Sequence, residues 1–186
     1  MLKICITGLL PANPRLNGAT VGEAHAEQVR AAIAAAPLAG GGIAVLDFGG
    51  VESASASYLK RLLSLFFDAK TPPVPVLVNV EAADLVEDLE DYLSNKGRVL
   101  VVAHEVRNEL RLSRLLGRMD GAAAETFQEL AKLKEATALQ LYERHRERTT
   151  NQTAWNNRLV QLVNLGVARR RREGRFWIYQ PTVTTN

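Results

Sequence analysis

Cysteine is almost absent from this chain, because Cys5 is the only one among 186 residues. A single thiol excludes an internal disulfide and any zinc site built on several cysteines. We expect Cys5 to be a small buried hydrophobe within the strand-like residues 3–7.

Long apolar runs are missing too. No stretch of the chain approaches the roughly twenty apolar residues that a membrane-spanning helix needs. The N-terminus also lacks the basic stretch, apolar core and cleavage site of a signal peptide. The sequence therefore predicts a cytoplasmic protein without a membrane partner.

Motifs for catalysis and for cofactor binding are lacking as well. Neither the phosphate-binding pattern GxxxxGK nor the dinucleotide-binding pattern GxGxxG occurs. His25, His104 and His145 are scattered, with no partner at a metal-ligand spacing. The acidic residues between 87 and 91 suit the solvated face of a helix better than a metal site. We therefore predict no enzyme activity, no cofactor and no metal ion.

What is present in residues 1–120 is an alternation of strand-like and helix-like segments. Apolar runs typical of buried strands lie at residues 2–7, 43–48, 76–80 and 99–103. Helical spacing of apolar residues lies at 21–36, 56–69 and 85–93. Because parallel strands need crossover connections, this order predicts an α/β fold, with a mostly parallel sheet covered by helices. We expect one more helix at 105–116, which could join or pair two subunits.

One stretch of this first segment is more specific than its periodicity. Asp47 ends a strand, Gly50 and Val51 follow in a tight turn, and serines open the next helix. This pattern resembles the STAS family, the anti-sigma-factor antagonists, and more closely the STAS-like domains of bacterial signalling proteins. The resemblance predicts a STAS-like sensor or interaction domain over residues 1–118. We expect Asp47 to stabilise the turn rather than to act in catalysis.

The same resemblance implies a phosphorylation switch at the start of that helix. The usual phosphoacceptor position of the family falls on Ala56, which leaves Ser55 and Ser57 as candidates. A phosphoserine is tolerated at a helix N-terminus and can change a partner surface. The alternative is that these serines only cap the helix and pack the turn.

Charge is unevenly divided along the chain. Residues 1–120 hold 12 Lys and Arg against 14 Asp and Glu, a balance of −2, whereas residues 121–186 hold 11 against 6, a balance of +5. Most of the excess consists of arginines from Arg144 onward. Such a concentration attracts polyphosphate, an acidic membrane surface or an acidic protein, and charge alone does not choose among them.

The order of secondary-structure elements in the basic segment distinguishes these partners more clearly than charge does. We expect helices at 122–134, after Thr137 and at 151–165, with Gly166 as a left-handed C-terminal residue. A basic hairpin over 167–181, with a Glu-Gly turn, follows. This order, and the phrase from Asn156 to Val167 above all, resembles winged helix-turn-helix regulators. The resemblance predicts a small α+β winged-helix domain over residues 119–186.

The expected roles of the side chains follow from groove chemistry. Asn and Gln amides pair with adenine in the major groove, and Thr meets the thymine methyl group. The candidates for base readout are Gln152, Thr153, Asn156 and Asn157. The candidates for contacts to the DNA backbone or the minor groove are Arg146, Arg148, Arg158, Arg171, Arg172 and Arg175. The helical register of Trp155 and the strand register of Trp177 favour core packing for both residues.

Two functions remain open at this point. The first is a transcription regulator that binds double-stranded DNA as a homodimer, with the STAS-like domain sensing a signal or a protein partner. The alternative is a partner-switch protein whose basic module docks another protein. Binding of single-stranded nucleic acid is a weaker third option, since it needs exposed aromatic residues.

Overall fold

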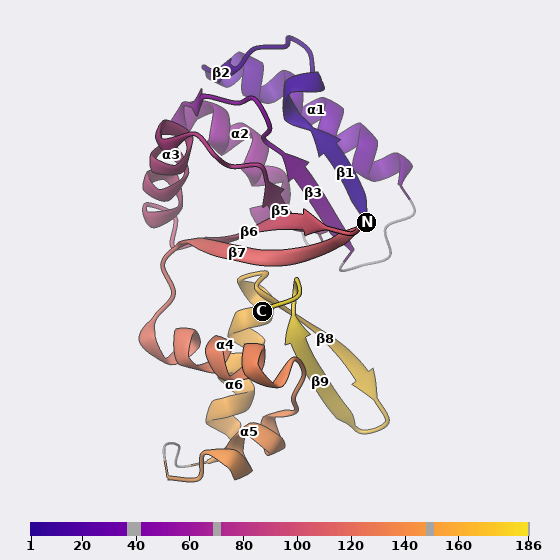
Figure 1. Cartoon of the computed structure of the whole chain (residues 1–186), viewed down its shortest axis with the longest axis vertical. Helices are drawn as coiled ribbons and strands as arrows, with labels where there is room; N and C mark the ends of the chain where they lie inside the picture. Colours follow the sequence, from indigo (N-terminus) through magenta and orange to yellow (C-terminus); the bar gives the residue numbers. More distant parts are fainter. Residues whose placement is uncertain (37–41, 69–71, 148–150, 186) are drawn as a thin grey trace.

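A five-stranded mixed sheet is the centre of the computed structural model, which describes residues 1–36, 42–68, 72–147 and 151–185 (Figure 1). Its strands, in spatial order, are β1 (Leu2–Cys5), β3 (Ile43–Asp47), β5 (Val74–Val78), β6 (Val99–Val106) and β7 (Glu109–Gly117). The first four are parallel, and β7 runs antiparallel to β6. The predicted α/β class with a mainly parallel sheet is confirmed.

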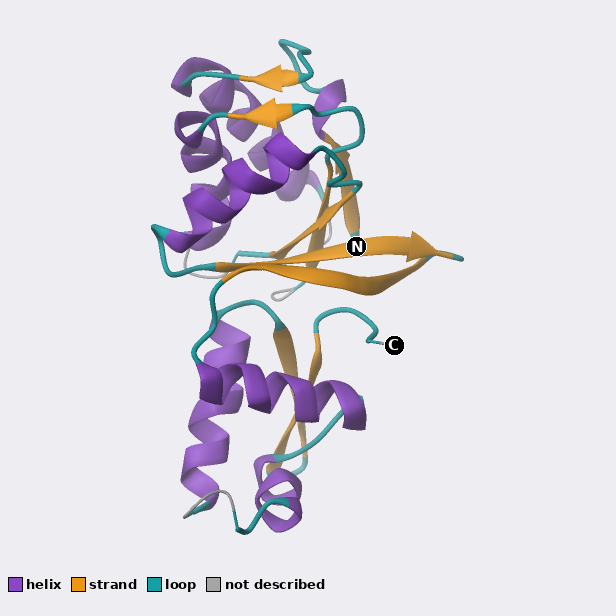
Figure 2. Ribbon diagram, turned by 60° about the vertical axis from the view of Figure 1, so that its left-hand side comes forward, coloured by secondary structure: helices purple, strands orange, loops and turns teal. Residues whose placement is uncertain are grey.

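The two faces of the sheet are covered differently (Figures 1 and 2). One face carries the crossover helices α1 (Ala19–Ala35), α2 (Ala56–Phe67) and α3 (Ala83–Ser94). The connections that lead into α1 and α2 contain a short 3₁₀ helix, η1 (Ile6–Gly8), and a parallel pair of two-residue strands, β2 (Arg15–Leu16) and β4 (Ser53–Ala54). The opposite face packs against the C-terminal module, residues 121–185.

The predicted helix at 105–116 is wrong. Strand β6 continues to Val106, and Arg107 and Asn108 form a two-residue turn with φ of 51° and 65°. Strand β7 then returns along β6. The leucines of this segment fit a helical period and a strand alternation almost equally, and pairing with β6 decides between them. The helix that was expected to join subunits is therefore a strand.

Strand β5 begins two residues before the predicted segment and includes Pro75. Proline is unusual inside a sheet because it lacks a backbone N–H. Val74 donates to the carbonyl of Gly42 on the β3 side, so the nitrogen of Pro75 faces β6. Pairing with β6 starts only at Val76, so no ladder bond is lost there.

The acidic side of α3 is less solvated than predicted. Asp88 accepts a hydrogen bond from the backbone N–H of Ala54 at 2.8 Å. Glu90 accepts one from the N–H of Gly117 at 2.7 Å. These two carboxylates attach α3 to the ends of β4 and β7. In the described part of the chain, no group of acidic, histidine or cysteine side chains is arranged to hold a metal ion.

The C-terminal module contains the predicted succession of elements. They are α4 (Gly121–Leu133), α5 (Ala138–Arg144), α6 (Gln152–Asn164), β8 (Ala168–Glu173) and β9 (Phe176–Pro181). Asp120, Thr137 and Asn151 cap the three helices through their side chains. Gly166 follows α6 with a φ of 76°, as predicted. None of the helices in the described residues combines the length and the apolar composition required to span a bilayer.

The module and the sheet share one apolar core. Val76, Val101 and Leu110 from the sheet belong to the same buried cluster as Phe127 and Tyr179 from the module. The last residues of the chain add a backbone connection, because Leu112 donates to Thr184, and Thr184 donates to Leu110. Residues near the C-terminus therefore cover part of the outer edge of β7.

Candidate nucleic-acid interface

Helix α6 presents one apolar and one polar face. Trp155, Leu159 and Leu162 are buried against the rest of the module, which confirms the core packing predicted for Trp155. Gln152, Thr153 and Asn157 lie near the start of α6 and are exposed. In the described structure none of these three side chains has a hydrogen-bond partner, so their donors and acceptors remain free for a ligand.

Asn156 differs from the other three residues that were predicted to read bases. Its side chain is half-buried, and its Oδ1 accepts a hydrogen bond from the hydroxyl of Tyr179 at 3.2 Å. Tyr179 belongs to β9 and is itself buried. Asn156 therefore joins α6 to the hairpin, and only part of its amide remains for base contact.

The hairpin of β8 and β9 has two different basic faces. Arg170 pairs in register with Tyr179, and Arg172 pairs with Trp177, so these four side chains share the face turned toward α6. Arg171 lies on the opposite face. There it forms ion pairs with Glu135 at 3.0 Å and with Glu173 at 3.6 Å.

Trp177 does not pack in the core, contrary to the prediction. It is 41% exposed, and the guanidinium carbon of Arg170 lies 4.5 Å from its ring centroid. Phe176 is 45% exposed and stacks similarly with Arg175 at 5.0 Å. Figure 1 shows the tip of the hairpin extending beyond the helices of the module, which agrees with the exposure of these two rings.

The predicted DNA-contact residues include Arg171 but not Arg170, and the structure places these two side chains on opposite faces of β8. Strand alternation from the buried Tyr179 would have identified Arg170 and Arg172 as members of one face. Neither has an acidic partner among the described residues, whereas Arg171 has two. The turn is formed by Gly174, with a φ of 57°, and Arg175 rather than by a Glu-Gly pair.

The remaining predicted arginines occupy the edges of this surface. The guanidinium carbon of Arg158 lies 5.4 Å from the ring centroid of Trp155, on the side of α6 away from the hairpin. Arg146 lies over Tyr142 just after α5. Arg148 is outside the described residues.

His145 directly follows α5 and contacts both α4 and α6. Its Nε2 lies 2.8 Å from Oε2 of Glu129 on α4, and its ring lies 5.4 Å from the ring of Trp155 on α6. The hydrogen bond from Lys132, against the effect of burial, and the contact with His145 lower the pKa of Glu129. The three helices are therefore held together at one polar point next to the start of α6.

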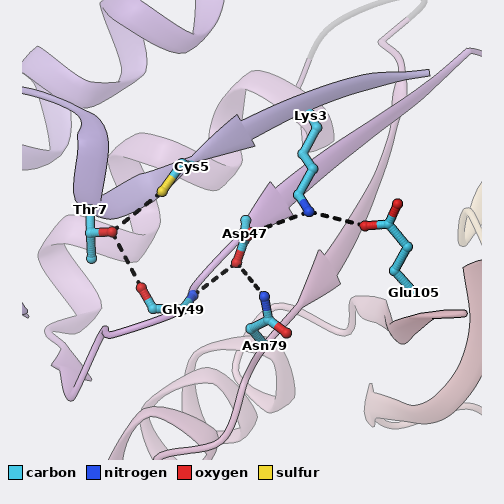
Figure 3. Close-up of polar contacts among 7 residues, drawn as sticks. All are labelled: Lys3, Cys5, Thr7, Asp47, Gly49, Asn79 and Glu105. Atoms are coloured by element: carbon cyan, nitrogen blue, oxygen red, sulfur yellow. Dashed lines mark hydrogen bonds and ion pairs between the residues drawn. The ribbon is translucent and has the colours of Figure 1, made fainter. Parts of the chain in front are cut away.

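A second polar cluster lies at the carboxyl ends of the parallel strands (Figure 3). Asp47 accepts hydrogen bonds from the N–H of Gly49 at 3.0 Å and from Nδ2 of Asn79 at 2.7 Å. Lys3 forms ion pairs with Asp47 at 3.4 Å and with Glu105 at 3.0 Å. Each oxygen of Asp47 is thus engaged within the protein, which confirms its predicted role in the turn.

Cys5 is exposed, contrary to the prediction of a buried residue. Its Sγ lies 3.4 Å from Oγ1 of Thr7, whose hydroxyl donates to the carbonyl of Gly49 (Figure 3). Strand β1 is at the edge of the sheet, and the C-terminal module packs against the strands farther along. The face that carries Cys5 is therefore open.

Ser55 has the capping role that was expected as the alternative to a switch. Its Oγ accepts hydrogen bonds from the N–H of Tyr58 at 3.4 Å and from the N–H of Gly18 at 3.1 Å. It also lies 3.1 Å from Oγ of Ser57, which is exposed. A phosphoryl group on Ser55 would disrupt the hydrogen bond from the N–H of Gly18. Phosphorylation of Ser55 or Ser57 stays a prediction.

The pH dependence of stability tests the role of Asp47. Burial alone would raise the pKa of Asp47, but the hydrogen bonds from Asn79 and Gly49 and the charge of Lys3 hold it below its ordinary value. A lowered pKa stabilises the folded state above the unfolded-state pKa of about 3.9, and this contribution is lost as pH falls through the folded-state pKa. Asp47→Asn is expected to cost about 1–2 kcal/mol of unfolding free energy at pH 7 and less as pH falls below about 4.

Urea denaturation at several pH values measures this effect. Asp91→Asn on the exposed side of α3 is the matched control, with no expected change. Equal losses for Asp47→Asn at pH 7 and at pH 2 would show that the charge of Asp47 contributes nothing to stability.

Comparisons with family models, with curated proteins and with solved structures find no significant match to this chain. The surfaces of the protein itself therefore provide the evidence for its function.

Proposed function

We propose that this protein is a transcription regulator that binds double-stranded DNA through α6 and the inner face of the β8–β9 hairpin. The observation that carries the proposal is the joint surface of these elements. The exposed amide and hydroxyl groups at the start of α6, and Arg170 and Arg172 without an acidic partner among the described residues, lie on two elements that the Tyr179–Asn156 hydrogen bond joins.

The chemistry of this surface suits duplex DNA. A helix fits the width of the major groove, and the side chains of Gln152, Thr153 and Asn157 offer the donors, acceptors and methyl group that read base edges. Arginines beside the helix neutralise phosphates or enter the adjacent minor groove. The three helices and the hairpin also occur in the order of a winged helix-turn-helix module, which we propose for residues 119–186.

The α/β segment is the proposed STAS-like sensor or interaction part of the same regulator. Its core is continuous with that of the DNA-binding module, so a change in the sheet has a direct physical route to α6. Homodimerisation on two inverted half-sites is part of the proposal.

A matched pair of arginine variants tests the proposal. A preferred duplex is first selected from a randomised pool, and fluorescence anisotropy then measures its Kd across a salt series. Arg170→Gln is expected to weaken binding about tenfold and to reduce the slope of log K against log salt by about 1. Arg171→Gln is expected to change Kd less than about twofold, because its charge is already paired on the opposite face.

Equal effects of the two substitutions would contradict the proposed contact face. Failure to enrich any sequence, with weak binding that does not distinguish duplexes, would contradict the regulator and would favour a protein partner for the basic module. A selected site without two-fold repeats would contradict the homodimer.

A further inference from the structure

A groove of about 400 Å³ lies between the sheet and the C-terminal module, on the hairpin side that does not face α6. This volume is in the usual range for a small-molecule site. Met1, Ile43 and Leu110 line it from the sheet segment, and Lys134, Arg169, Gln180 and residues 181–185 line it from the module. Both parts of the chain therefore contribute to one concave site.

Arg169 is the unusual residue of this groove. It is half-buried, and burial lowers the pKa of its guanidinium. Its Nε is shielded from solvent and has no hydrogen-bond partner in the described structure. A shielded N–H group without a partner is costly, and native proteins normally compensate it with a hydrogen bond to a protein group, a water or a ligand. Two residues further along the strand, Arg171 has such partners.

The other walls indicate the character of a missing partner. Lys134 adds a second positive charge, whereas the one carboxylate among the described lining residues, that of Glu109, lies 3.7 Å from Arg111. Ile43, Leu110 and Val183 add apolar surface, and Gln180 and three threonines add uncharged polar groups. A guanidinium beside apolar walls favours an anion that carries a hydrocarbon part, because a carboxylate matches the paired N–H groups of arginine.

We propose that this groove binds a small organic acid, whose carboxylate pairs with Arg169 while its hydrocarbon part lies against Ile43 and Leu110. The site is separate from the α6 surface, since Arg169 and Arg170 lie on opposite faces of β8. The proposal therefore stands or fails independently of DNA binding.

Benzoate and its uncharged analogue benzamide are suitable probes for the full-length protein. In ¹⁵N-labelled protein, benzoate is expected to shift the Nε–H resonance of Arg169 in a saturable manner, and benzamide at the same concentration is expected to leave it unchanged. Benzoate at about ten times its Kd is also expected to raise the unfolding temperature by about 3–5 °C. Absence of saturation, or an equal response to benzamide, would overturn the proposal.

Variants on the same hairpin provide the second arm of the test. Arg169→Gln is expected to weaken benzoate binding at least about tenfold, as loss of a charge-assisted pair requires. Arg171→Gln lies two residues away on the same hairpin face but does not line the groove, and is expected to bind benzoate like the unaltered protein. If Arg169→Gln binds benzoate normally, or if Arg171→Gln loses binding equally, the assigned site is wrong. The comparison of benzoate with benzamide on the unaltered protein decides the question even if Arg169→Gln does not fold.

Discussion

Substitution of Asn157 by alanine is expected to cost about 1–3 kcal/mol of binding free energy on the preferred duplex and almost nothing on a scrambled one. Asn157 is exposed on α6, is free of described partners, and lies one helical turn from the exposed Thr153. An asparagine amide in this position can donate and accept at once on adenine, and alanine can do neither. The loss should therefore appear as lost discrimination between duplexes.

Asn164 provides the matched control, because it is an exposed asparagine on the same side of the same helix. It lies about 10 Å further along α6, at the end next to the sheet, where a groove contact at the start of the helix would not reach it. Asn164→Ala is expected to change affinity for the preferred duplex less than about twofold. Equal weakening on preferred and scrambled duplexes by Asn157→Ala would identify a phosphate contact in place of base readout. Asn156→Ala is a poorer test, since it also removes the bond to Tyr179.

Substitution of Gly117 by alanine is expected to lower the free energy of unfolding by about 3–5 kcal/mol. Gly117 ends β7 with a φ of 87°, a conformation that strains any residue with a Cβ. A Cβ there would also lie 2.1 Å from the carbonyl oxygen of Arg98 and 3.2 Å from Cβ of Leu93. Since Arg98 contributes backbone rather than a flexible side-chain end, β7 must move and loosen its bond to Glu90.

Gly97→Ala separates backbone strain from the steric clash. Gly97 also has a positive φ, of 59°, but a Cβ there would have no atom within 4 Å. It is expected to lose only about 1–2 kcal/mol, the cost of the left-handed conformation. Urea denaturation of both variants gives the comparison. Equal losses at the two glycines would show that the contact with Arg98 relaxes without cost.

Local signals predicted most of the secondary structure. Apolar runs bounded by glycine identified β3 and β6, and the apolar spacing of Leu59, Leu62 and Leu63 identified α2. Capping residues placed the helix starts in the module, where Thr137 forms a complete capping box with Gln140. Such signals depend on neighbours in the chain, so a single sequence suffices to find them.

The errors share a different cause. Leu110 and Leu112 suit a helix or a strand, and only pairing with β6 makes their segment a strand. Cys5 and Trp177 have apolar neighbours in the chain, yet both lie where the neighbouring layer ends and are exposed. Burial depends on which layers meet, and local periodicity carries no information about that.

For the candidate DNA-binding surface, the sequence by itself determined the polar character of α6 and the concentration of arginine after it. The tertiary structure decided which of these groups are free. It pairs Arg171 with Glu135, uses Asn156 to hold Tyr179, and leaves Arg170 and Asn157 open. It also leaves the shielded Nε of the half-buried Arg169 without a hydrogen-bond partner in the described structure, at the groove between the sheet and the module. The sequence determines where charged residues occur and how apolar residues are spaced. The pairing and burial of each charge depend on contacts between residues distant in sequence.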